Sequence, residues 1–61
     1  MDWIAEKNRI AARLTACNTV QQLGLVWADE HDTIKALRAG DRALGIQVVN
    51  LKNLKKSELG E

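Results

Sequence analysis

The sequence predicts an all-α protein, a small bundle of three or four short helices. Pro, Phe and Tyr are absent, whereas residues that favour helices (Ala, Leu, Gln, Lys, Arg and Glu) are plentiful. Apolar residues recur at helical spacing along most of the chain, and typical capping residues stand between the apolar segments. We therefore expect residues 1–61 to form a single small helical domain.

The first helix is expected over residues 3–16, with Asp2 as its N-cap. Most charged residues of this segment lie away from its apolar side on a helical wheel. The apolar side is formed by residues at intervals of seven, four and three: Trp3, Ile10, Leu14 and Cys17. This face is expected to enter the core.

A corner at residues 17–19 precedes the second helix. Thr19 is placed to cap that helix and Gln22 to reach back, which makes a Ser/Thr-x-x-Glu/Gln capping box. The apolar face of the second helix is expected to contain Val20, Leu23, Val26 and Trp27. Gly24 weakens a helix by about 0.8–1 kcal/mol relative to Ala. Its presence among good helix formers therefore indicates close approach by a neighbouring helix.

An acidic segment, residues 29–32, ends this apolar pattern. Asp32 or Thr33 is expected to cap a short segment that contains Ile34 and Leu37. Whether that segment continues the second helix stays open at this point.

A last helix is expected after a junction at which Gly40 provides a left-handed stop and Asp41 a fresh cap. Residues 45–51 also suit a strand, because they combine a Gly with adjacent β-branched residues. A helix is favoured, since a lone strand needs a partner strand that the rest of the chain does not offer.

The small size of the chain predicts dependence on a partner. A chain of this length buries only about 60% of the surface that its unfolded form exposes. Cys17 is the single cysteine, so no internal disulfide adds stability, and one Cys with one His (His31) falls short of a structural zinc site. We expect a homodimer, with apolar residues of the first helix or of residues 46–54 at the interface.

No enzymatic activity, metal site or cofactor is expected. The acidic residues around His31 point in different directions on a helix, so a solvated helix end is the favoured interpretation. So small a chain is not expected to make a sheltered cleft that shifts a carboxylate pKa. Cys17, near a helix N-terminus, has the setting of an activated thiol, but a small buried hydrophobe is favoured.

Charge and hydropathy limit the classes of partner and location. Nine Lys and Arg against eight Asp and Glu give a net charge of +1, so no global field draws the chain toward nucleic acid or a membrane. No apolar run approaches the ~18 residues of a membrane span, and the order of residues after Met1 is not that of a signal peptide. The cytoplasm is the expected location, and a lone thiol agrees with it.

Five residues are the candidate binding residues: Trp3, Trp27, Lys52, Lys55 and Lys56. Tryptophan at helical spacing is typical of a core, but interfaces are also enriched in it, and Trp3 at the free end of its helix is the better candidate for an anchor. The lysines form a local positive stripe. Such a stripe complements the dipole at a helix C-terminus or makes weak contact with nucleic-acid phosphates.

Several short motifs resemble the C-terminal helical tail of phage single-strand annealing recombination proteins of the RecT and ERF kind. The resemblance covers about residues 14–59, without the annealing core. It is carried by Cys17-Asn18-Thr19-Val20-x-x-Leu23-x-x-x-Trp27, Ile34-x-x-Leu37, Asp41-x-x-Leu44 and Lys52-Asn53-x-Lys55-Lys56-x-Glu58-Leu59. It implies a tail that contacts a partner exonuclease or a single-strand DNA-binding protein, with the apolar motif residues in the scaffold and the lysines on the exposed rim.

A second resemblance concerns Arg13-Leu14-x-x-Cys17-x-Thr19-Val20-x-x-Leu23, which is similar to the start of the Hha and YmoA family. That family implies a nucleoid-associated modulator of transcription, but its later aromatic-rich helix is absent because the chain has no Phe or Tyr. The favoured hypothesis is thus a non-catalytic protein interaction module of phage or bacterial DNA recombination and repair. The alternatives are an Hha-like modulator and a small phage inhibitor of a host enzyme.

Overall fold

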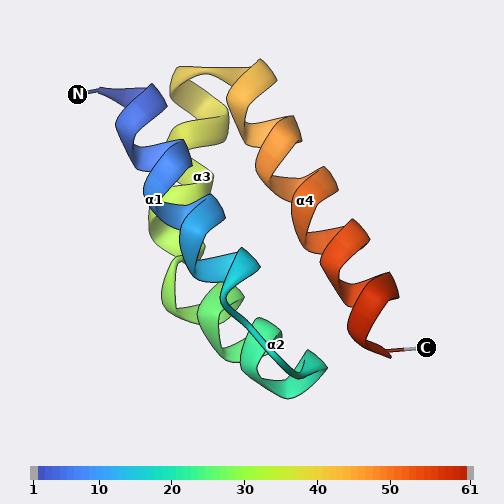
Figure 1. The fold of residues 1–61 in the computed structure, drawn as a ribbon. Helices are drawn as coiled ribbons and strands as arrows, with labels where there is room; N and C mark the ends of the chain where they lie inside the picture. Colours follow the sequence, from blue (N-terminus) through green and yellow to red (C-terminus); the bar gives the residue numbers. More distant parts are fainter. Residues whose placement is uncertain (1, 61) are drawn as a thin grey trace.

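The molecule is a small all-α bundle, as predicted. The computed structural model describes residues 2–60, which contain four helices and no strand. The helices are α1 (Trp3–Thr15), α2 (Val20–Asp29), α3 (His31–Gly40) and α4 (Arg42–Gly60). In Figure 1, α1 and α4 run in the same direction, and α2 followed by α3 returns in the opposite direction. Residues 45–51, the segment that also suited a strand, lie within α4.

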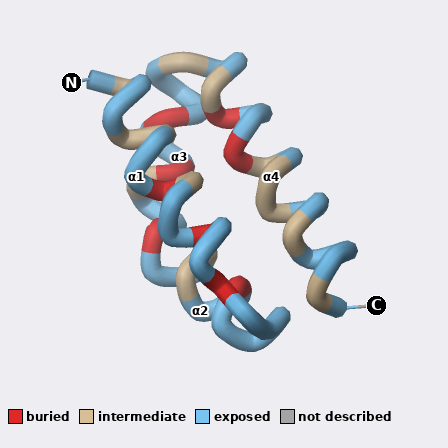
Figure 2. Tube along the Cα trace, viewed as in Figure 1, coloured by how far each residue is buried: buried red, intermediate tan, exposed pale blue. Residues whose placement is uncertain are grey.

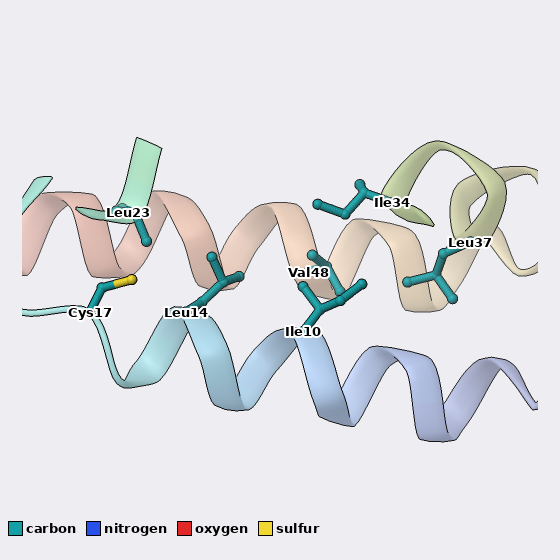
Figure 3. Packing of buried hydrophobic residues seen from close by; sticks show 7 residues of the cluster. All are labelled: Ile10, Leu14, Cys17, Leu23, Ile34, Leu37 and Val48. Atoms are coloured by element: carbon teal, nitrogen blue, oxygen red, sulfur yellow. The ribbon is translucent and has the colours of Figure 1, made fainter. Parts of the chain in front are cut away.

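One apolar cluster holds the helices together. α4 packs mainly against α1 and α3, and the buried parts of the chain lie on the faces that the helices turn toward one another (Figure 2). Figure 3 shows side chains of α1, α3 and α4 meeting in this interior. The cluster consists of Ile10, Leu14, Cys17, Leu23, Ile34, Leu37 and Val48. The apolar face predicted for the first helix is therefore confirmed, including the burial of Cys17.

Side-chain caps begin two of the helices as predicted. The carboxylate of Asp2 accepts a hydrogen bond from the backbone N–H of Ala5 at 3.1 Å, at the start of α1. Asp41 Oδ1 accepts one from the backbone N–H of Leu44 at 3.3 Å, at the start of α4. Both bonds satisfy amide donors that have no partner within the helix.

The corner between α1 and α2 contains the predicted cap at Thr19, but the Gln22 side chain binds the backbone of Asn18 and not that of Thr19. Thr19 Oγ1 accepts from the backbone N–H of Gln22 at 3.0 Å. The Gln22 side chain reaches back one residue beyond the cap, and its Oε1 accepts from the backbone N–H of Asn18 at 2.8 Å. Both bonds stabilise the turn that carries the chain from α1 into α2.

Two predicted helix boundaries are wrong. α3 begins at His31, immediately after Glu30, so Asp32 and Thr33 lie within its first turn and do not cap it. The junction between α2 and α3 lies at Glu30, whose side chain binds Arg9 and Arg13 of α1 and makes no capping hydrogen bond. Gly40 is the last residue of α3, and no glycine in residues 2–60 has a positive φ. The chain leaves α3 through Asp41, whose extended backbone needs no left-handed residue.

The close approach expected at Gly24 occurs at other glycines. Nothing lies within 4 Å of the position that a Gly24 Cβ would occupy, so this prediction is wrong. A Cβ at Gly45, by contrast, would lie 2.8 Å from Arg38 Cα, because α3 and α4 cross there with their backbones close together. A Cβ at Gly40 would collide with the ring of Trp3. Contacts between helices, and not the local sequence, therefore determine at which glycines a side chain would be crowded.

Candidate functional site

Trp27 and Lys52 connect α2 to α4 on the outer surface of the bundle. The Nζ atom of Lys52 lies 5.0 Å from the centroid of the Trp27 ring, a cation–π arrangement. Both side chains are half-buried. At a partly exposed site such a contact contributes about 0.5–1 kcal/mol. Two of the five candidate binding residues, 25 positions apart, are thus in contact.

These two residues line a hollow, which we call the α2–α4 groove. Its volume is about 170 Å³, and its lining is Val20, Leu23, Gly24, Trp27, Lys52 and Lys56. Leu23 is buried and Lys56 is exposed, so the groove has an apolar base and a positive edge. The absence of a side chain at Gly24 leaves space in this surface.

The other two candidate residues lie outside this groove. Trp3, at the start of α1, is half-buried against Gly40 at the end of α3. Its ring therefore closes the contact between these helices. Lys55 is half-buried on α4 and does not line the groove. The structure thus brings together Trp27, Lys52 and Lys56, and separates Trp3 from them.

A larger hollow, the α3–α4 groove, adjoins the first and went unnoticed in the sequence. It measures about 510 Å³ and shares Trp27 with the α2–α4 groove. The other lining residues are His31, Ile34, Lys35, Arg38, Ala39, Arg42 and Ile46. Lys35, Arg38 and Arg42 follow at intervals of three and four. Within one helix, that spacing would place the three cations on one face. The sequence did not reveal this groove because the chain changes helix at Asp41, between Arg38 and Arg42.

Glu30 lies at the centre of an ion-pair cluster that the sequence analysis also missed. The residue is only 4% exposed, so the expected solvated helix end is wrong at this position. Arg9 donates to both oxygens, at 2.6 and 2.9 Å, and Arg13 donates to Oε2 at 2.5 Å. Arg13 also contacts Asp29 at 2.8 Å. We call Glu30, Arg9, Arg13 and Asp29 the Glu30 cluster.

The Glu30 cluster is suited to structure and not to proton transfer. The hydrogen bond from Arg9, supported by that from Arg13, lowers the pKa of Glu30 from 4.5 to about 2, although burial acts in the opposite direction. A carboxylate that is ionised at all ordinary pH values and bound by two guanidinium groups has no free role as a base. It ties the α2–α3 break to α1.

Cys17 is buried at the corner after α1, as the favoured interpretation predicted. Its thiol donates a hydrogen bond to the backbone carbonyl of Arg13, with the Sγ atom 3.4 Å from that oxygen. This places the sulfur inside the apolar cluster (Figure 3).

Within residues 2–60, no helix combines the length and apolar character needed to cross a bilayer. The same part of the chain contains no group of three or more His, Cys, Asp or Glu residues arranged to hold a metal ion.

Comparison of the chain with protein-family models, curated proteins and solved structures finds no match. The resemblances to the RecT and ERF tail and to the Hha and YmoA family therefore stay predictions from short motifs.

Proposed function

We propose that this protein is a non-catalytic docking module that binds another protein through the α2–α4 groove and its rim. The observation that carries this proposal is the meeting of Trp27, Lys52 and Lys56 around one small hollow. Tryptophan and long cationic side chains beside an apolar base are typical of the anchoring points of protein interfaces. A ring held in place by Lys52 also loses little conformational entropy when a partner covers it.

The process that we propose is DNA recombination and repair in a phage or bacterium, in the cytoplasm. The module would dock a recombination protein onto an exonuclease or a single-strand DNA-binding protein. The RecT and ERF resemblance supports this assignment, because it implies apolar motif residues in a scaffold and lysines on a rim. Leu23 and Leu37 are buried in the bundle and Lys56 is exposed, as that division implies, whereas Lys52 and Lys55 are half-buried.

We also propose that the module acts as a homodimer. Leu54 is 60% exposed, and it belongs to the segment expected at a dimer interface. A small core gains stability when a second copy covers such residues. Sedimentation at micromolar concentration tests this: a dimer that Leu54→Lys converts to monomer is expected, and a wild-type monomer would contradict it.

Capture experiments with purified partners test the docking proposal. The chain is immobilised and offered a bacterial single-strand DNA-binding protein or a phage exonuclease. Gly24→Leu is expected to weaken binding by about tenfold or more, because its side chain enters open space and fills the groove without disturbing the core. Lys52→Glu together with Lys56→Glu is expected to do the same by reversing the charge of the rim.

Gly24→Ala and Lys7→Glu are the matched controls. The first adds only a methyl group, and the second reverses a single charge on α1, at a residue that does not line the groove. Both are expected to retain binding. Failure to capture either partner would refute the named partners, and capture of a DNA-silencing protein instead would favour the Hha-like alternative.

A further inference from the structure

The α3–α4 groove concentrates positive charge that no carboxylate of its own surface balances. Lys35, Arg38 and Arg42 line it, and none of the lining residues is acidic. Within residues 2–60, every ion pair involves Arg9 or Arg13, so the cations of this groove have no ionic partner there. The net charge of +1 therefore conceals a local excess of positive charge.

Gly45 has a direct part in building this surface. Because it has no side chain, the backbone of α4 approaches α3 so closely that the stem of Arg38 lies across Gly45. The aliphatic stem is held by packing while the guanidinium end remains on the exposed surface, as is usual for long cationic side chains. The groove is thus supported by the crossing of two helices and is not a mobile loop.

The groove also contains apolar surface that needs cover. Ile34 is buried at its base, Trp27 is half-buried, and Ile46 on the α4 side is 45% exposed. A volume of about 510 Å³ lies within the range of about 300–1,000 Å³ that is usual for ligand pockets. An occupant that matches this surface carries negative charge around an apolar side chain.

We propose that the α3–α4 groove binds an acidic peptide segment of a protein partner, with carboxylates at Lys35, Arg38 and Arg42 and an apolar side chain between Trp27 and Ile46. The inference rests on the proposed docking function and names the chemistry of the segment that docks. It also makes this groove, and not the smaller α2–α4 groove alone, a principal binding surface.

A single strand of nucleic acid fits the same cations but not the rest of the groove. Proteins that bind single strands stack successive bases on several aromatic side chains. Apart from the imidazole of His31, Trp27 has the one aromatic ring in either groove, and Lys52 already lies over that ring. The flat faces of bases also match the side chain of Ile46 less well than a branched aliphatic side chain does. The acidic peptide is therefore the occupant that matches both the charge and the apolar surface.

Fluorescence anisotropy with the full chain tests this proposal. The probe is a labelled short peptide in which Asp residues flank a single Leu, and the competitors are the same peptide with Ser in place of Leu and a thymidine oligonucleotide. The Leu peptide is expected to bind, and its affinity is expected to fall as salt shortens the Debye length from about 10 Å at 0.1 M to about 3 Å at 1 M. The Ser peptide is expected to bind more weakly with the same salt dependence.

Three variants locate the site. Arg42→Glu and Lys35→Glu, at exposed positions, are each expected to lower the affinity for the Leu peptide by about tenfold. Ile46→Ser is expected to remove the preference for Leu over Ser. Lys7→Glu, with the same charge change on α1, is the control and is expected to bind normally. Circular dichroism verifies that all four variants remain helical.

Several outcomes would overturn the inference: equal affinity of Arg42→Glu and wild type, no binding of the Leu peptide, or tighter binding of the oligonucleotide. Its failure is distinguishable from failure of the docking proposal. A partner captured equally well by wild type and Arg42→Glu refutes this groove but leaves docking intact. Binding of the Leu peptide without capture of either named partner supports the groove and refutes the named partners.

Discussion

The Glu30 cluster and the α3–α4 groove use the same kind of side chain for opposite purposes. In the Glu30 cluster, Arg9 and Arg13 of α1 are bound to carboxylates, one of them almost completely buried. In the α3–α4 groove, Lys35, Arg38 and Arg42 face no carboxylate of the groove. Net charge therefore says little about where this protein can bind an anionic partner, because the pairing of each cation decides which charges remain available.

The largest expected effect separates stability from binding. Arg9→Met with Arg13→Met leaves the Glu30 carboxylate buried without its guanidinium partners, and we expect a clear fall in the free energy of unfolding. Lys35→Met with Arg42→Met removes the same number of charges at exposed positions of the groove, and we expect a change within about 0.5 kcal/mol. Urea denaturation measures both. Equal losses in the two double variants would remove the distinction between the regions.

Acid is the next test, because the Glu30 cluster depends on an ionised carboxylate and the lining of the α3–α4 groove contains none. The pKa of Glu30 is lowered to about 2 in the folded protein, so its ion pairs stabilise the fold above the unfolded pKa of about 4.5. That stability is lost as the pH falls from about 5 to 2, and we expect a loss of about 2–3 kcal/mol. Glu30→Gln is expected to be less stable at pH 7 and to lose this part of the acid sensitivity. An unchanged pH profile in Glu30→Gln would contradict the assignment.

Two glycine variants test the helix crossing beneath the groove. Gly45→Ala places a Cβ 2.8 Å from Arg38 Cα, and we expect a destabilisation of about 1–3 kcal/mol together with weaker binding of the acidic peptide. Gly24→Ala is the matched control, because its Cβ meets open space. We expect it to stabilise the protein by about 0.8–1 kcal/mol through helix propensity. Thermal unfolding measures both changes in stability, which we expect to have opposite signs. A stabilising effect of Gly45→Ala would disprove the close crossing of α3 and α4.

The smallest effect is expected at the contact between the two grooves. Lys52→Met removes the cation above Trp27, and we expect a loss of about 0.5–1 kcal/mol and a change in tryptophan fluorescence. Lys56→Met, one turn further along α4 at an exposed position, is expected to alter neither quantity. If both variants behave alike, Lys52 does not hold the ring.

Individual residues show which features could be predicted from the sequence. The caps at Asp2, Thr19 and Asp41 join residues three positions apart, so short-range spacing sufficed to predict them. The site was only partly predicted: Trp27, Lys52 and Lys56 meet, but Trp3 does not join them. The α3–α4 groove was not predicted at all, because its residues belong to three helices whose crossing no local pattern describes.

The sequence by itself determined the helical class, the apolar face of the first helix and most helix starts, because propensity, periodicity and capping act within one or two turns. Only the tertiary structure decided which glycines are crowded and which charges are paired. Arg9 and Glu30 are hydrogen-bonded although they lie 21 positions apart in the sequence. Gly24 faces open space, whereas Gly45 is crowded by Arg38. Such contacts depend on where helices that are distant in sequence cross. At a crossing, a buried carboxylate needs charged partners, and a glycine allows two backbones to approach closely.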